Sequence, residues 1–504
     1  MAAARAGRGA VLVGAGQVRN RPGLDGPFDP QEPGRLMATA VRRAVEDAGV
    51  PDLLEDADLV ATVAPIILRY ADTPEALVRF LGTGPKAGLE AVPGGDSPCS
   101  LLNEVANRIR EGEVRIALLA GAEAVHSKRR ARKEGVDLDW TPNAKDKKVM
   151  GDQRFIANEI EMRHGIFAPI QSYPLFENAL RAHAGRSIEE HQVFVSEFMA
   201  RYSEVAARNP VSWFPDPRTA EEIREVGPKN RWICFPYTKL MNAIIEVDQG
   251  AALVVMSEDE ADRRGIAENA RVAYLGGAKA ADAWTPTERV DFVSSPAYRA
   301  ASKRALELSG TDLSQVDAFD LYSCFPSAVE LAASELGISL DDPRGLTLTG
   351  GLAHHGGPGN NYAMHSLANA FNWTRGASRT AYVSGLGMAM TKHSASVLSS
   401  DRERIAAAER RSEVLDISPE LVTGPELADQ PDGPGTIETY TVEFERDGTP
   451  ARGIVVVRLD DGRRTVAHVE PRPEVFARLL ETEAVGLRGR ASAGADQPNG
   501  FALD

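Results

Sequence analysis

The sequence predicts an α/β fold made of two related halves, interrupted by a helical lobe and followed by a small β unit. Short apolar runs typical of buried strands alternate with amphipathic helical stretches along the chain. The order of small residues, helix, glycine, apolar strand and glycine at residues 97–125 returns at residues 361–390, which indicates an internal duplication. From this alternation we expect a mostly parallel sheet with helices on both faces.

The first half begins with a strand and continues as alternating helices and strands. Residues 11–14 are apolar and end in Gly-Ala-Gly, which predicts a strand and a turn. Apolar side chains recur at helical spacing in residues 35–48 and 101–109. Continuous apolar runs at residues 59–63 and 116–120 predict further buried strands. The Gly-Ala-Gly turn lacks the third glycine and the acidic residue of a dinucleotide-binding motif, so we exclude that function.

A polar, helix-rich segment at residues 127–242 interrupts the first half. It carries three of the five tryptophans and many charges, so we expect a lobe or lid over the sheet. Residues 251–256 close the first half and residues 271–275 open the second.

The C-terminal part has the pattern of antiparallel strands. A turn-rich joint at residues 430–435 precedes an alternating run at 438–444 and a β-branched run at 453–459. Asp-Gly pairs follow each of these two runs, as in hairpin turns. We therefore expect a small antiparallel β unit, a barrel, appended to the core.

Charge and cysteine content exclude several classes of protein. The net charge of −15 argues against nucleic-acid binding, which needs a basic face. One basic run, at residues 128–133, predicts either a solvated helix face or a site for an anionic phosphate such as the nucleotide end of CoA. The three cysteines are odd in number and lack CxxC spacing, so we expect no disulfide framework, no metal site and a cytoplasmic location. No run approaches the roughly 20 apolar residues of a membrane span.

Five sequence blocks, in order, resemble the thiolase superfamily. They are GEVRIALLAGAEA at 112–124, PYTKLMNAIIEVDQGAALVVMSEDEA at 236–261, DLYSCFPSAVE at 320–330, GGLAHHGGPGNNY at 350–362 and SGLGMA at 384–389. The third is similar to the NEAF and HDCF blocks of thiolases, and the fourth to their GGxxxxGHPxGA block. GGPGNNY, together with the strand-rich stretch at 440–459, most resembles thiolase-like proteins of type 1, which carry an additional C-terminal domain.

The resemblance implies a duplicated, five-layer αβαβα thiolase fold with an inserted lobe and a C-terminal antiparallel β-barrel. It divides the chain into a thiolase N-terminal half at 1–126 and 243–267, a helical lobe at 127–242, a thiolase C-terminal half at 268–405 and an additional β domain at 406–504.

Thiolase chemistry needs a thiolate at a helix N-terminus, where the helix dipole lowers the thiol pKa. By the resemblance, that position falls on Gly95. Cys99 lies one helical turn further on, and we expect either a nucleophile or a small buried helix residue there. Ser97 is placed to cap the helix, with a minor alternative as nucleophile.

Thiolases also need a histidine base, and its position falls on Gly357. His354 and His355 precede it on a glycine-rich loop that can re-aim side chains, so either is a candidate functional group. Asn360 and Asn361 are assigned to substrate binding, with capping of the following helix as the alternative.

Three further positions complete the candidate site. Tyr322 replaces the asparagine or histidine that helps to hold the oxyanion, and its phenol can donate one hydrogen bond. No thiol stands at residues 382–384, where thiolases carry their second cysteine. His365 and His393 resemble positions of the type 1 proteins, and we assign both, with Gly95, Ser97 and Gly357, to substrate binding.

These replacements favour a degenerate or altered acyltransferase that binds CoA or acyl-CoA thioesters and requires no cofactor. The resemblance itself implies acetyl-CoA acetyltransferase activity in lipid metabolism. Two alternatives stay open. One is an active acyltransferase or thioesterase using Cys99, His354 or His355; the other is a non-catalytic scaffold whose C-terminal barrel docks a partner enzyme. We expect a monomer or a weak dimer.

Overall fold

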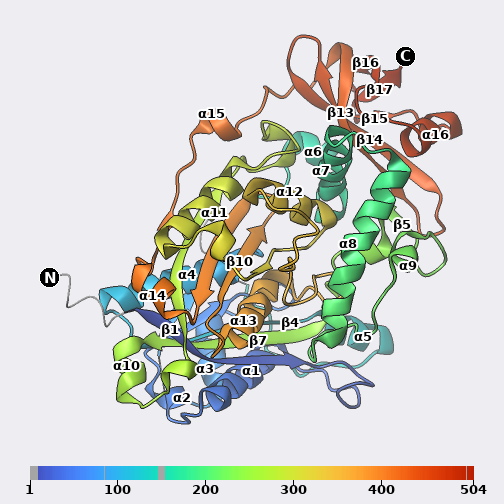
Figure 1. The fold of residues 1–504 in the computed structure, drawn as a ribbon. Helices are drawn as coiled ribbons and strands as arrows, with labels where there is room; N and C mark the ends of the chain where they lie inside the picture. Colours follow the sequence, from blue (N-terminus) through green and yellow to red (C-terminus); the bar gives the residue numbers. More distant parts are fainter. Residues whose placement is uncertain (1–8, 85, 146–151, 153, 495–496) are drawn as a thin grey trace.

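A ten-stranded mixed sheet forms the core of the protein in the computed structural model (Figure 1). The structure describes residues 9–84, 86–145, 152, 154–494 and 497–504. The strand order is β3-β2-β4-β7-β1-β8-β11-β10-β9, with β12 paired to β8. The strands of the first half are β1 Ala10–Arg19, β2 Leu59–Val63, β3 Ala87–Glu90, β4 Ile116–Ala124 and β7 Asp248–Ser257. Those of the second half are β8 Val272–Ala281, β9 Ala318–Asp320, β10 Thr380–Gly387, β11 Lys392–Ser399 and β12 Arg411–Val414.

The two halves repeat one pairing pattern, which confirms the predicted duplication. In the first half β2 is parallel to β4, and the pairs β4–β7 and β7–β1 are antiparallel. In the second half β9 is parallel to β10, and the pairs β10–β11 and β11–β8 are antiparallel. The halves meet through two residue pairs between β1 and β8.

The expectation of a mostly parallel sheet is wrong. The longest pairings are antiparallel, because β11 follows β10 through a turn of four residues and therefore runs back beside it. Helix–strand alternation indicated parallel crossovers but not these returning strands.

Helices occupy three layers around the two sheet halves. Helix α4 (Ser97–Glu111) and helix α13 (Tyr362–Thr374) pack against each other and contact strands of both halves, so they form the middle layer. Helix α1 (Pro33–Ala48) and helix α3 (Thr73–Leu81) cover the first half, and α11 (Pro296–Ser309) covers the second beside α12 (Pro326–Leu336). This is the five-layer arrangement that the resemblance to thiolases implies.

The inserted segment is a helical lobe, and most of it lies between the core and the C-terminal domain (Figure 1). Its helices are α5 Val125–Glu134, α6 Glu159–Arg163, α7 Pro169–His183, α8 Ile188–Arg208 and α9 Ala220–Arg224, followed by the short strands β5 Trp232–Cys234 and β6 Tyr237–Thr238. Helix α7 contacts both α12 of the core and β13 (Asp432–Phe444) of the C-terminal domain, so the lobe joins the two.

The C-terminal strands form a closed five-stranded barrel, as predicted. They are β13 Asp432–Phe444, β14 Pro450–Leu459, β15 Arg464–Val469, β16 Arg488–Ser492 and β17 Gly500–Leu503, with helix α16 (Pro473–Glu481) between β15 and β16. Pairs around the barrel are antiparallel except β15–β17, which is parallel. Strand β5 of the lobe adds to β13, and β12, just before the barrel, pairs with β8 of the core.

No helix in the described ranges is long and apolar enough to cross a membrane. The three cysteines are all buried and free.

Candidate functional site

Gly95 has no room for a side chain. It lies just before helix α4, and a Cβ atom built on it would stand 2.6 Å from Cζ of Tyr322, with the phenolic oxygen and the carbonyl oxygen of Leu386 closer still. Real Cβ atoms do not approach heavy atoms this closely. The space that the resemblance assigns to a nucleophile is therefore filled by the phenol.

Tyr322 is held firmly in this position. Its backbone N–H donates to Oγ of Ser384 at 3.1 Å, and its ring meets the Tyr362 ring edge-on with centroids 5.7 Å apart. Burial raises the pKa of its phenol well above the usual value, and the nearby Cys324 adds to the shift. The phenol therefore stays protonated and neutral at the base of the candidate site.

Cys99 lies inside helix α4, fully buried. Burial raises the pKa of its thiol to about 12, although the hydroxyls of Ser396 and Ser394 oppose the shift. Within the described ranges, the charged groups that act on this thiol are the carboxylates of Asp96 and Asp320, and no imidazole is among them. The neutral thiol lacks the base and the cationic surroundings that reactive cysteines need.

Ser97 does not cap helix α4. Asp96 occupies the cap position without a side-chain capping bond, and Ser97 is the first helical residue. Its hydroxyl donates to the carbonyl of Val92 at 2.5 Å, which fixes the loop that leads to Gly95.

His355 is buried in a polar cage. Its Nδ1 lies 3.1 Å from Oγ of Ser212, and its carbonyl accepts hydrogen bonds from Trp213 N–H and from Nε2 of Gln249. The His365 ring stands against it, with centroids 4.9 Å apart. Burial, and then the neighbouring His365, lower the pKa of His355 well below its usual value, so the imidazole is neutral.

His354 faces away from this cage. It lines a small cleft with Tyr202, Ser323 and Phe325, and its Nε2 is buried without a hydrogen-bond partner. Burial lowers its pKa to about 4. The two histidines of the block therefore point to different surroundings.

Gly357 differs from Gly95 in the space around it. A Cβ at Gly357 would lie 3.2 Å from Cδ2 of Leu352 and 3.4 Å from the carbonyl oxygen of Ile244. These contacts are tight but need only small adjustments. At the position assigned to the base, a small side chain would therefore fit after slight movement of its neighbours, unlike at Gly95.

Asn360, Asn361 and His365 connect the two halves. Asn361 donates from Nδ2 to the carbonyl of Gly121 at 2.6 Å, Asn360 to that of Ala64 at 3.4 Å, and Nδ1 of His365 lies 2.6 Å from Oε1 of Gln17. Asn361 makes no capping bond to helix α13. Oδ1 of Asn361 and Nε2 of His365 are buried without partners.

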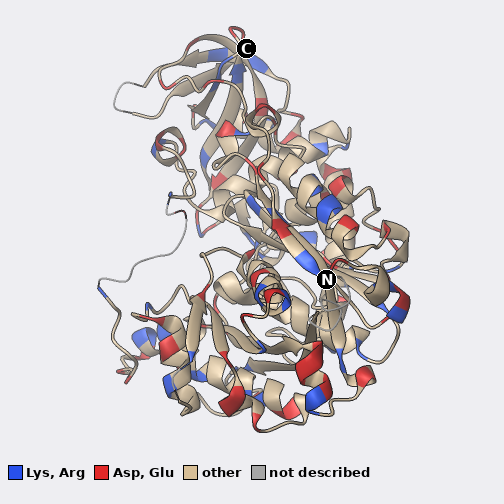
Figure 2. Cartoon of the chain, turned by 90° about the vertical axis from the view of Figure 1, so that its left-hand side faces the viewer, with Lys and Arg blue, Asp and Glu red and all other residues tan. Residues whose placement is uncertain are grey.

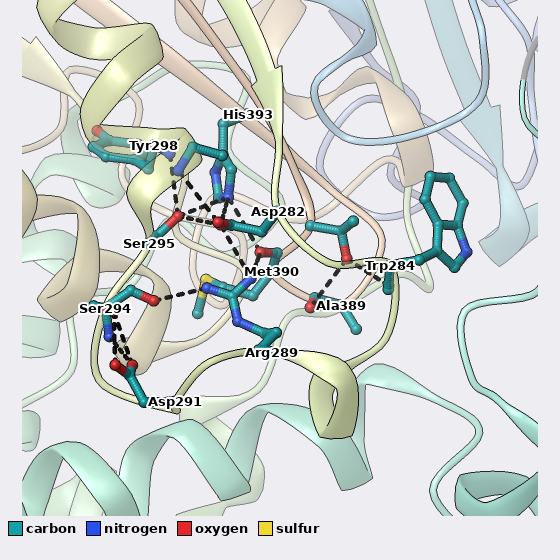
Figure 3. A network of polar contacts seen from close by, with 12 residues as sticks. Asp282, Trp284, Arg289, Asp291, Ser294, Ser295, Tyr298, Ala389, Met390 and His393 are labelled. Atoms are coloured by element: carbon teal, nitrogen blue, oxygen red, sulfur yellow. Dashed lines mark hydrogen bonds and ion pairs between the residues drawn. The ribbon is translucent and has the colours of Figure 1, made fainter. Parts of the chain in front are cut away.

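His393 belongs to a separate buried network (Figure 3). Its Nε2 lies 3.1 Å from each of Oδ2 of Asp282, Oγ of Ser295 and the carbonyl of Met390. A Ser-His-Asp triad uses the two ring nitrogens for the two partners. Here one nitrogen contacts both, and Ser295 also donates to Asp282, so the group is not arranged as a nucleophilic triad.

The guanidinium of Arg289 balances the negative charge of Asp282 in this network. Its guanidinium lies 3.1 Å from Oδ2 of Asp282 and donates to the carbonyls of Met390 and Ser294, both at 2.7 Å (Figure 3). Despite burial, Arg289 and His393 hold the pKa of Asp282 well below its usual value. The network is a structural ion pair that fixes the turn between β10 and β11.

Tyr173, which α7 of the lobe inserts beside the site, is marked by no pattern in the sequence. Its hydroxyl donates to the carbonyl of Met388 at 3.2 Å, and its ring stacks on Phe325 with centroids 4.4 Å apart. Tyr173 also acts on the thiol of Cys324, whose pKa burial raises to about 12. Only the fold of the lobe brings this ring across to the third sequence block.

The basic run lies on helix α5 and is mostly paired. Lys128 donates to the carbonyl of Ile67, and Arg129 and Arg130 pair with Glu246 and Glu134. Arg132 and Lys133 are exposed, without an ion pair among the described residues. In the cartoon of Figure 2, backbone segments of acidic residues (red) and of basic residues (blue) are interspersed along the chain.

The structure brings Gly95, Tyr322 and Tyr362 together, and likewise His355 and His365. Among the residues that the structure describes, no imidazole acts on the thiol of Cys99. The roles assigned to these residues remain predictions.

Comparison with solved structures shows a relative that matches over the full length of the chain. The monomeric SCP2-thiolase-like protein type 1 of Mycobacterium smegmatis is 33% identical and superposes with a TM-score of 0.81, over 99% of this chain and 100% of that chain. A family model described as the thiolase-like protein type 1 additional C-terminal domain matches residues 417–494. A search of curated proteins found no match.

More distant structures share the fold. The Ltp2–ChsH2(DUF35) aldolase is 20% identical with a TM-score of 0.59, over 79% of this chain and 99% of that chain. The acetyl-CoA acetyltransferase of Syntrophomonas wolfei is 16% identical with a TM-score of 0.55, over 78% and 99%.

Proposed function

This chain belongs to the SCP2-thiolase-like proteins of type 1, and we propose that it binds CoA or an acyl-CoA thioester without forming an acyl-enzyme. The observation that carries the proposal is the phenol of Tyr322 in the space that a nucleophilic side chain at Gly95 would need. We assign it to a reducing cytoplasm, in keeping with its three free thiols.

Cys99 does not replace the missing nucleophile. A thiol with a pKa of about 12 is almost wholly protonated at neutral pH, and a protonated thiol is a poor nucleophile. Its neighbours Ser394 and Ser396 are hydroxyls and cannot act as general bases at this pH. Acylation of Cys99 would also need a path through the core, because the side chain is fully buried.

The histidines do not replace the missing base. A general base needs a pKa near the working pH, and burial holds the pKa of His354 near 4 and that of His355 well below 6.5. Neutral imidazoles with such low pKa values accept protons weakly. They can still hydrogen-bond to a ligand.

Binding is supported by polar atoms around the histidine block. Nε2 of His354, Nε2 of His365, Oε1 of Gln249 and Oδ1 of Asn361 are buried without hydrogen-bond partners in the described chain. Buried polar atoms are normally paired, and unpaired ones in a native structure call for an explanation. Of these atoms, Nε2 of His354 lies at a cleft, and a polar ligand there, such as a thioester or pantetheine amide, would supply its partner.

Thiolysis and condensation assays test the catalytic part. We expect acetoacetyl-CoA and acetyl-CoA to turn over no faster with the wild-type protein than with Cys99→Ala or His355→Gln. A measurable rate that either substitution lowers at least tenfold would instead support an active acyltransferase or thioesterase.

Calorimetry tests the binding part. Titration with CoA, acetyl-CoA and a long-chain acyl-CoA should give saturable heat, and His354→Ala, which removes an unpaired polar atom, should weaken it. The absence of heat and of any thermal shift for all three ligands would rule binding out.

A second candidate is docking of a partner enzyme through the C-terminal barrel, motivated by the Ltp2–ChsH2(DUF35) aldolase, whose name pairs a thiolase-fold protein with a second chain. Deleting the barrel is a poor test, because Arg464 of the barrel is fully buried against the carbonyls of Thr287 and Arg289. Arg472 and Arg490 are exposed, so charge reversal there should leave the fold intact. Loss of a co-purifying acyl-metabolic enzyme on these changes, but not on Arg129→Glu, would support docking.

A further inference from the structure

A cavity of about 430 Å³ lies beside helix α4, where the N-terminal part of the helix faces the ends of β8 and β11. Asp96, Ser100, Leu101 and Glu104 form its helical wall, spaced as one face of a helix. Its volume lies within the range of small-molecule sites. Gly95, Cys99, Tyr322 and the histidines of the 354–355 block do not line it, so it is distinct from the candidate thioester site.

Lys279 supplies an unpaired positive charge inside this cavity. In the β8–β11 register Lys279 lies directly opposite Ser394, so the two side chains are on the same face of the sheet. The Ser394 hydroxyl donates to the carbonyl of Asp96, which shows that this face is the one that packs on α4. Gly277, two residues earlier on the same face, lies against Asn103 of α4. Lys279 forms no ion pair or side-chain hydrogen bond within the described part of the chain, and it is half-buried.

The other charged groups of the lining are already engaged. Nζ of Lys392 lies 3.2 Å from Oδ1 of Asp96 and donates to the carbonyl of Pro93 at 2.5 Å. Glu104 pairs with Arg108, and Oε2 of Glu90 accepts from the backbone of Thr73.

Asp416 is exposed at the rim, where water screens its charge. His393 turns its ring to the opposite face of the sheet, onto Tyr298. The lysine at 279 is thus the one inward-facing charge left without a counter-charge in the described lining.

The rest of the wall is apolar. Ala91, Val92, Leu101 and Leu415 line the cavity, and Val414 on β12 stands at its rim. Val414 is 68% exposed, the highest value among the large apolar side chains in the described ranges. An apolar ligand that covers these side chains removes them from water, which favours binding by about 25 cal/mol for each Å² of apolar surface buried.

We propose that this cavity binds a small carboxylate with an apolar tail, such as a medium-chain fatty acid. The carboxylate pairs with Lys279, and the tail covers Val92, Leu101, Val414 and Leu415. A neutral or cationic amphiphile would leave the ammonium of Lys279 unpaired or repelled, so the site selects for the anion. The proposal does not rest on thioester binding, because the ligand carries no CoA.

Calorimetric titration of the full-length protein with decanoate, below its micelle-forming concentration, tests the proposal. Decanol and decyltrimethylammonium are the charge controls. We expect saturable decanoate binding at least tenfold tighter than that of either control. Lys279→Gln should weaken decanoate binding about tenfold, whereas Lys303→Gln, on exposed α11, should leave it unchanged.

A second variant locates the ligand independently of charge. Ala281, exposed at the end of β8, lines the cavity, so Ala281→Trp should fill it without altering the core. This variant should abolish decanoate binding while the melting temperature stays unchanged. Decanoyl-CoA, which has no free carboxylate, should neither compete with decanoate nor lose affinity in Lys279→Gln.

Three results would overturn the proposal: no saturable decanoate binding, equal binding of decanol or the cation, or full affinity in both Lys279→Gln and Ala281→Trp. If the full-length protein binds decanoate but not decanoyl-CoA, that result would count against the proposed function and not against this cavity.

Discussion

Two glycines stand where the family resemblance places the catalytic nucleophile and base, and the space around them differs. At Gly95 a phenol and a backbone carbonyl leave no room for even a methyl group, whereas at Gly357 the nearest atom to an added Cβ would be 3.2 Å away. Tyr322 and Gly95 therefore form a complementary pair. Restoring a nucleophile would require changing both.

Gly95→Ala should destabilise the protein by about 1–3 kcal/mol, the usual cost of overpacking a core. In a Tyr322→Ala background the same substitution should cost less, because the phenol that it meets is absent. Urea unfolding of the two single variants and the double variant measures this coupling. Gly357→Ala is the matched control and should cost less than Gly95→Ala; equal costs, with no coupling to Tyr322, would contradict the packing argument.

Glu123 provides a pH-dependent test. It is buried, accepts backbone N–H bonds from Ile66 and Ile67 at 2.5 and 3.2 Å, and burial raises its pKa to about 7. Because the folded-state pKa exceeds the unfolded value, the folded protein binds its proton more tightly. The associated stability is complete below about pH 4 and is lost as the pH rises through 7.

The free energy of unfolding should therefore fall less between pH 5 and pH 8 in Glu123→Gln than in the wild type. The difference should be on the order of 3 kcal/mol, the contribution of this one carboxyl group. Thermal melts of wild type and variant across this range measure the slope. Parallel slopes would show that Glu123 does not titrate there. Exposed Glu104→Gln is the control and should leave the slope unchanged.

At the scale of elements, the lobe and the barrel are fixed to the core by buried polar contacts. Nδ2 of Asn178 on α7 donates to the carbonyl of Tyr440, and Arg181 pairs with Glu483 at 2.6 Å. Arg464 on β15 donates to the carbonyl of Thr287 at 2.8 Å and pairs with Glu438. The barrel is therefore part of one folded unit with the core.

Arg464→Met should destabilise the protein by about 3–5 kcal/mol, because it leaves buried carbonyls unpaired and Glu438 with one partner fewer. Arg458 pairs with the same carboxylate from a partly exposed position, so Arg458→Met is a matched control and should cost about 1 kcal/mol or less. Similar losses in urea unfolding for the two variants would show that Arg464 does not anchor the barrel.

The sequence predicted the elements better than their contacts. Strand and helix periodicity, with the five blocks, predicted the duplicated core, the inserted lobe and the barrel. It did not predict the antiparallel returns, which depend on turn geometry, or the insertion of Tyr173 from α7, which depends on how the lobe packs. It marked Gly95 and Tyr322 individually, but their contact joins residues 227 positions apart and appears only in the fold.

At the scale of the whole molecule, the short strand at the end of the large sheet affects whether two copies of the chain can pair through their sheets. Strand β3, at the end of the sheet, is only four residues long, and short edge strands are weak templates for pairing with another chain. The full-length relative from Mycobacterium smegmatis is itself described as monomeric.

We therefore expect a monomer of 54.2 kDa in solution. Light scattering coupled to size-exclusion chromatography, over a hundredfold range of protein concentration, measures the mass. A mass near twice that value that persists on dilution would contradict a monomer; a dimer only at the highest concentration would indicate weak association.

Intact-protein mass spectrometry after incubation with acetoacetyl-CoA, quenched in acid, tests most directly whether the fold retains thiolase chemistry. With Tyr322 in the nucleophile's space and a neutral, buried thiol at Cys99, the protein mass should stay unchanged, and Cys99 should resist iodoacetamide until the chain is unfolded. An acetyl adduct on Cys99 that disappears on addition of CoA would show a working acyl-enzyme and contradict the account.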